Sequence, residues 1–167
     1  MNYYPSKIFA NLLNEILNQP DKYTFQRIHK NISGVLYCAF LIEAHINEIG
    51  YEHLRITSII EKEMKWSTLK KWQEYPKMQG INCKSWDFSQ SSKLFKEISK
   101  ILALRDSLAH LKADEFQKDP IGILKTKFNA KETYKNTVYL LEKFYKETGI
   151  IPPDQLSLIL PHHLYKD

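Results

Sequence analysis

Residues 32–50 read ISGVLYCAFLIEAHINEIG and form the broadest apolar helical face of the chain. Its apolar side chains recur at helical spacing: Ile32, Val35, Leu36, Ala39, Phe40, Ile42, Ile46 and Ile49. A face this broad is typical of the central helix of a bundle, which has neighbours on several sides. We expect Gly50 to end this helix. Its start falls near Tyr23 or Asn31, so residues 21–30 are either its first turns or a separate turn.

Two segments on either side of this helix have the same periodicity. The first is predicted to begin near Pro5 and to stop before Pro20, and its apolar face consists of Ile8, Phe9, Leu12, Leu13, Ile16 and Leu17. The second covers residues 53–75. We expect Ser67 to cap a short second piece of this segment and Pro76 to end it.

Two more helices are predicted after a polar loop over residues 76–91. They run from about Ser92 to Lys112 and from about Ala130 to Glu147. The sequence lacks the sustained two-residue alternation of a half-buried strand. It therefore predicts an all-α protein, an antiparallel bundle of four to five main helices. Residues 1–150 form one domain and residues 151–167 a C-terminal tail.

Composition sets the broad class of the protein. The chain has 167 residues, of which 43% are hydrophobic, enough for one folded domain with a core. The net charge of +5 permits an anionic partner but is also common in ordinary soluble proteins. Cys38 and Cys83 form neither a disulfide framework nor a metal pattern, and we expect Cys38 to be buried. No apolar stretch approaches the roughly 20 residues of a membrane span, and no signal peptide is evident, so a cytoplasmic location is expected.

Residues 105–112 read RDSLAHLK and carry the chemistry of the chain. Arg105 is always charged, whereas His110 titrates near neutral pH. A histidine moves protons and an arginine holds the charge that grows on phosphate oxygens, so this pair suits phosphodiester cleavage. On an ideal helix, residues five apart point about 140° away from each other, whereas Asp106 and His110 share a face. Arg105 and His110 therefore meet on one phosphate only if the helix bends or a second subunit supplies one of them.

The spacing Arg-x-x-x-x-His resembles the signature of the HEPN superfamily, whose catalytic members are small all-α ribonucleases. The order of elements over residues 31–146 is also similar: a helix with Glu43 and Asn47, a Trp- and Lys-rich helix ending in a proline, a polar loop, the motif helix and a closing helix. Two positions depart from the pattern. Asp106 replaces the usual Asn, and Lys112 stands where some toxin members have a Tyr.

The resemblance implies a metal-independent endoribonuclease without a cofactor. His110 would act as general base or acid and Arg105 would stabilise the transition state, leaving a 2′,3′-cyclic phosphate and a 5′-hydroxyl. Asp106 would orient the imidazole and raise its pKa. Glu43, Asn47 and Lys112 would line the cleft or bind RNA. The resemblance also implies a homodimer with the site at its interface, and a toxin with a protein antitoxin or a role in antiviral defence.

Other interpretations remain open. A non-catalytic helical dimer of the same fold that binds RNA or a protein partner is the alternative function. Arg105 and His110 are also suited to binding the last carbonyls of a helix, and Glu43 and Asn47 to an ordinary surface. His45 is either solvated or structural. A further set of lysines and aromatic residues has two interpretations. Either the lysines follow an RNA backbone and the aromatic rings stack on bases, or the lysines form a solvated face and the aromatic rings pack in the core. The set consists of Lys62, Lys65, Lys70, Lys71, Lys77, Lys84, Lys93, Lys96 and Lys100, with Trp66, Trp72, Tyr75 and Trp86.

Overall fold

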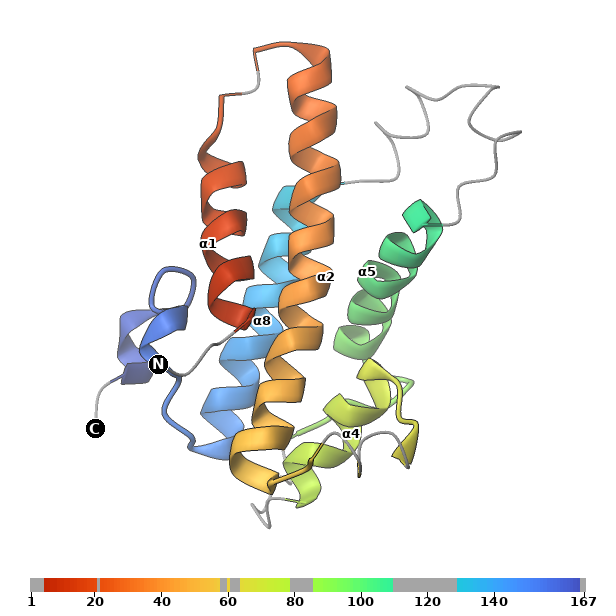
Figure 1. The fold of residues 1–167 in the computed structure, drawn as a ribbon, viewed down its shortest axis with the longest axis vertical. Coiled ribbons are helices and arrows are strands. Elements are labelled where there is room, and N and C mark those ends of the chain that lie inside the picture. Colours follow the sequence, from red (N-terminus) through yellow and green to blue (C-terminus); the bar gives the residue numbers. More distant parts are fainter. Residues whose placement is uncertain are drawn as a thin grey trace.

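The computed structural model describes residues 5–20, 22–57, 60, 64–78, 86–109 and 129–165. Within these ranges the chain is all-helical and has no β-strand, which confirms the predicted all-α bundle (Figure 1). The elements are α1 (Pro5–Asn18), α2 (Thr24–Leu54), α4 (Thr68–Met78), α5 (Lys93–Ala109), α8 (Ala130–Thr148) and two 3₁₀ helices, η1 (Asp154–Leu156) and η2 (His162–Tyr165).

Helix α2 is the centre of the bundle and contacts α1, α4, α5 and α8 (Figure 1). The backbone N–H of Ala130 donates to Asn31 and the hydroxyl of Tyr145 lies 2.6 Å from His45 Nε2, so α8 runs parallel to α2. Successive long helices alternate in direction, so α1 and α5 run antiparallel to α2 (Figure 1).

The bounds of α2 settle one open point and correct one prediction. Residues 24–30 are the first turns of α2, and the side chain of Gln26 accepts from the Tyr23 backbone N–H at 3.3 Å. Gly50 does not end the helix. The chain continues to Leu54 and turns at Arg55, which takes the left-handed conformation with φ 54°. Gly50 instead permits close packing, because a Cβ there would lie 2.5 Å from Cε2 of Tyr75 in α4.

Helix α4 begins where the sequence predicts but does not end at Pro76. Ser67 Oγ accepts from the Lys70 backbone N–H at 3.3 Å, which confirms the predicted cap. Pro76 lies inside α4 and has no N–H to donate to the carbonyl of Trp72, four residues earlier. The indole N–H of Trp86 donates to that carbonyl at 3.0 Å instead. A tertiary hydrogen bond thus replaces the helical one, and α4 passes through the proline.

The core consists of apolar side chains from every helix and of an aromatic cluster around Trp72 of α4. Trp72 is fully buried and packs on Trp86, Phe88 and Phe144 at centroid distances of 5.4–6.5 Å. Tyr75 is 2% exposed. These rings serve packing and are not accessible for base stacking. On α1 the predicted face needs one correction, since Ile8 is 37% exposed while Leu13 and Ile16 are buried.

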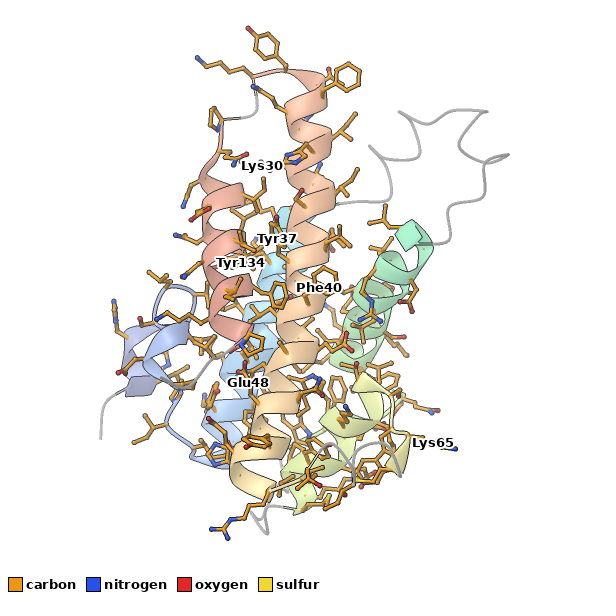
Figure 2. The ribbon with its side chains drawn as sticks, viewed as in Figure 1. Lys30, Tyr37, Phe40, Glu48, Lys65 and Tyr134 are labelled. Carbon is orange, nitrogen blue, oxygen red and sulfur yellow. The ribbon has the colours of Figure 1, made fainter. Side chains whose placement is uncertain are left out.

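A buried polar network ties α1 and α8 to α2. His45 is 2% exposed, which confirms its structural interpretation. Its Nε2 lies 2.6 Å from the hydroxyl of Tyr145, and its Nδ1 lies 3.8 Å from the Glu48 carboxylate. Ser6 donates to Glu48 through its backbone N–H at 2.8 Å and through its hydroxyl. Figure 2 shows Glu48 on α2 beside the beginning of α1.

The other sequence expectations have mixed outcomes. Cys38 is buried as predicted, and burial raises the pKa of its thiol to about 12; Cys83 lies outside the described residues. In the tail, Leu156, Ile159 and Leu160 are buried and η1 contacts α1. Among the described helices, α2 is long and apolar enough to cross a membrane by length and composition alone, contrary to the expectation that no stretch would be. Half of its apolar window is buried in the bundle.

Candidate functional site

Arg105 lies near the C-terminal end of the described part of α5, on the stripe that faces the bundle. Ile98 and Ile101 are buried, and Arg105 follows them at helical spacing of seven and four residues. Its side chain is 23% exposed. The guanidinium therefore sits at the edge of the α2–α5 interface, partly accessible to solvent.

Two carboxylates bind the guanidinium of Arg105. Nη1 donates to Oε2 of Glu43, which comes from α2. Nε donates to Oδ1 of Asp106 at 3.0 Å, and Nη2 forms an ion pair with the same oxygen at 2.9 Å. Hydrogen bonds between two ionised groups are the strong ones, and the planar fork of arginine suits this geometry. One positive charge thus faces two negative charges from two helices.

A second polar contact lies one turn further along α2. Asn47 Oδ1 accepts from Lys71 Nζ of α4 at 2.8 Å. Lys71 is only 7% exposed, so this lysine belongs to the α2–α4 interface and not to a solvated face or an RNA track. Glu43 and Asn47, four residues apart on one face of α2, therefore connect α2 to two different helices.

The structure brings together three of the six predicted site residues, namely Arg105, Asp106 and Glu43, and bonds Asn47 to Lys71. His110 and Lys112 lie outside the described residues. The predicted contact between Asp106 and His110 stays a prediction, while the contact that Asp106 makes here is with Arg105. The hydrogen bonds of the Arg105 side chain go to carboxylates throughout the described ranges, and not to the last carbonyls of the helix.

The contact of Lys71 with Asn47 was not predicted from the sequence. One signal pointed to it: Lys71 precedes Trp72 and stands four residues before Tyr75, and both of these residues are buried. A lysine on the apolar face of a helix needs a polar partner, and Asn47 supplies one. In the described part of the chain, no group of three or more His, Cys, Asp or Glu side chains is arranged to hold a metal ion.

Comparisons of the chain with protein-family models, with curated proteins and with solved structures give no match. The case for a functional site therefore rests on the contacts of Arg105 and on the sequence around it.

Proposed function

We propose that this chain is a metal-independent endoribonuclease of the HEPN type. The observation that supports it best is the contact between Arg105 of the Arg-x-x-x-x-His motif and Glu43 of α2. Both residues were predicted site members from the sequence, and although they are 62 positions apart they meet in the fold. The partial exposure of Arg105 leaves a side of the guanidinium open to a ligand.

In the proposed reaction, Arg105 binds the scissile phosphate and stabilises the charge that develops on it. His110, or a second His110, takes the proton from a ribose 2′-hydroxyl, and the 2′-oxygen forms a bond to phosphorus. The bond from phosphorus to the 5′-oxygen breaks, and this oxygen receives a proton from a protonated imidazole. The products are a 2′,3′-cyclic phosphate and a 5′-hydroxyl end.

Phosphate binding requires an exchange at the guanidinium. Asp106 is 62% exposed and lies against Nε and Nη2 of Arg105, whereas Glu43 is 42% exposed and reaches the guanidinium from the neighbouring helix. We propose that Asp106 moves away when the phosphate binds and that Glu43 keeps the guanidinium in place. Asp106 would then be free to orient His110, four residues later in the sequence.

We further propose that the working site needs two copies of the chain in a homodimer. Side chains five apart on a helix diverge by about 140°, so one α5 does not aim both Arg105 and His110 at one phosphate. Two copies related by a twofold axis would place the Arg105 of each beside the His110 of the other. A cytoplasmic toxin or antiviral defence enzyme, held inactive by an antitoxin protein, is the setting that we propose for this activity.

A non-catalytic helical dimer that binds RNA or a protein is the second candidate. The observation that favours it is the pairing of Arg105, on the bundle-facing stripe of α5, with two carboxylates, Glu43 and Asp106, which already balance its charge. This candidate predicts RNA affinity that falls steeply with salt and does not change in His110→Ala, or binding to a protein alone.

The test is cleavage of tRNA or total RNA by the purified protein in EDTA. We expect Arg105→Ala and His110→Ala to lower the cleavage rate by about a hundredfold or more. Matched controls are Arg27→Ala and His53→Ala, which change exposed side chains of the same types on α2 and should cleave like the parent. Absence of cleavage by the parent, or equal rates in all five proteins, would contradict the proposal.

A further inference from the structure

The solvent-facing side of α5 carries a row of lysines on the opposite face from Arg105. Lys96 and Lys100 follow Lys93 by three and seven residues, and all three side chains are exposed. Lys100 pairs with Glu97 at 2.8 Å. Lys93 and Lys96 have no ion-pair partner among the residues that the structure describes. Two uncompensated positive charges therefore lie side by side on this face.

A groove between α5 and α8 lies beside this row. Its hollow measures about 420 Å³, and its lining includes Lys93 and Glu97 of α5 and Asn136, Tyr139 and Lys143 of α8. Tyr139 is 55% exposed, so its ring is accessible to a ligand in this hollow. A second hollow of about 500 Å³ shares Lys93 and Glu97 and extends the surface to Lys96 and Lys100. We call these two adjoining hollows the α5–α8 groove.

The charge of the α5–α8 groove is positive. Four lysines line it against two carboxylates, those of Asp87 and Glu97, and one of these lysines, Lys143, pairs with Glu147 at 3.4 Å. Glu97 is neutralised by Lys100. Asp87 accepts from the hydroxyl and the backbone N–H of Ser89, and these hydrogen bonds lower its pKa. Neither carboxylate faces Lys93 or Lys96 in an ion pair, so an incoming anion meets free ammonium groups.

We infer that the α5–α8 groove binds single-stranded RNA, with Tyr139 stacking on a base and Lys93 and Lys96 contacting phosphates. An exposed aromatic ring beside a row of cations is the arrangement by which proteins bind single strands without reading sequence. A duplex suits it less, because its bases are already stacked on one another. Tyr139 takes the role that Trp72, Tyr75 and Trp86 cannot fill, since those rings are buried.

This groove is separate from the Arg105 site and would hold RNA that flanks the cleaved bond. Lys93 and Arg105 are twelve residues apart, about 18 Å along the axis of α5, and face away from each other. The inference rests on the proposed function only for the choice of RNA as the ligand. Binding in the groove requires no catalysis, so the two can be tested apart.

The experiment measures fluorescence anisotropy of a labelled single-stranded 2′-O-methyl oligonucleotide, which cannot be cleaved by 2′-hydroxyl attack, with the full chain in EDTA. We expect Lys93→Gln/Lys96→Gln to weaken binding about tenfold at low salt and to reduce the slope of log K against log salt by about 1 to 1.5. Tyr139→Ser should weaken binding about five- to a hundredfold and leave that slope unchanged.

Matched controls remove the same groups elsewhere. Lys7→Gln/Lys22→Gln changes the net charge equally on the α1 side of the bundle, and Tyr51→Ser removes a tyrosine that is 70% exposed. Both should bind within about twofold of the parent. Equal losses in groove and control variants, no binding by the parent, or a parent that binds anionic vesicles but not the oligonucleotide would each overturn the inference.

Failure of the inference differs from failure of the proposed function. If the parent cleaves RNA and the groove variants bind the oligonucleotide as the parent does, only the inference that the α5–α8 groove binds RNA is overturned. A parent that binds through the groove but does not cleave RNA, or that cleaves no faster than Arg105→Ala and His110→Ala, overturns the proposed ribonuclease activity alone.

Discussion

Arg105 shares its guanidinium between two carboxylates that differ in exposure and in the helix that carries them. Glu43 reaches it from α2, so this ion pair also joins two helices. Asp106 is the next residue along α5 and is more exposed, at 62% against 42% for Glu43. An exposed pair contributes little to stability and exchanges readily, so Asp106 is the partner that a phosphate would displace in the proposed reaction.

This difference predicts that removing Asp106 and removing Glu43 affect RNA cleavage in different ways. Asp106→Asn removes the competing carboxylate, so KM for RNA should fall a few-fold. Glu43→Gln removes the charge that fixes the guanidinium, so kcat/KM should fall roughly tenfold. Steady-state kinetics on a defined RNA measure both. Glu52→Gln, an exposed carboxylate on the same helix as Glu43, is the control. A rise of KM in Asp106→Asn would contradict the proposed exchange.

At the residue scale, part of the site was predictable from the sequence. The spacing of Glu43 and Asn47 placed both on one face of α2, and the motif marked Arg105. Pairing of Arg105 with Glu43 depends on how α5 packs against α2, which no local pattern encodes. Lys71 was one lysine among nine in its region, and its burial depends on the docking of α4.

At the element scale, contacts spaced along the C-terminal half of α2 hold α4. The indole of Trp72 donates to the carbonyl of Ile42 at 3.2 Å, Lys71 donates to Asn47 at 2.8 Å, and the ring of Tyr75 lies over Gly50. Periodicity predicted these helices well because apolar spacing is a local property. It misjudged Gly50 and Pro76 as helix ends, because a tertiary contact decides the role of each.

The Gly50 contact makes a testable prediction about stability. A Cβ at Gly50 would lie 2.5 Å from Cε2 and 3.1 Å from Cζ of Tyr75, which is 2% exposed. Overpacking costs roughly 1–3 kcal/mol, more than the ~1 kcal/mol gained by replacing a helical glycine with alanine. Urea unfolding followed by circular dichroism should therefore show that Gly50→Ala destabilises the protein.

The Tyr75→Leu background provides the control for this prediction. Without the ring, Gly50→Ala should be neutral or stabilising, since only the gain in helix propensity remains. The same loss of stability in both backgrounds would show that the contact with Tyr75 is not the cause.

At the scale of the whole molecule, the bundle orients α5 so that its two ends have different surroundings. The lysine row at the beginning of α5 faces solvent, and Arg105 near its end faces α2. The helix order and the all-α class were predictable from the sequence. Assembly with a second copy stays a prediction.

The composite site predicts complementation between two inactive variants. Light scattering should give about twice the chain mass of 19.8 kDa. When Arg105→Ala and His110→Ala are mixed and allowed to exchange subunits, half of the dimers are mixed, and each mixed dimer has one intact site out of two. RNA cleavage should therefore return to about a quarter of the parental rate. A mixture as inactive as its components would place Arg105 and His110 of one chain in the same site.

The chemistry of the cut is the most direct check on the proposed ribonuclease. The measurement uses one defined RNA in EDTA, made with ribose or with 2′-deoxyribose at the nucleotide before the cut. The parent should cleave the all-ribose strand to a 2′,3′-cyclic phosphate and a 5′-hydroxyl and leave the deoxy-substituted strand intact at that position, because the attacking 2′-hydroxyl is gone. Cleavage of both strands, products with a 5′-phosphate, or no cleavage of either strand would contradict the ribonuclease that we propose.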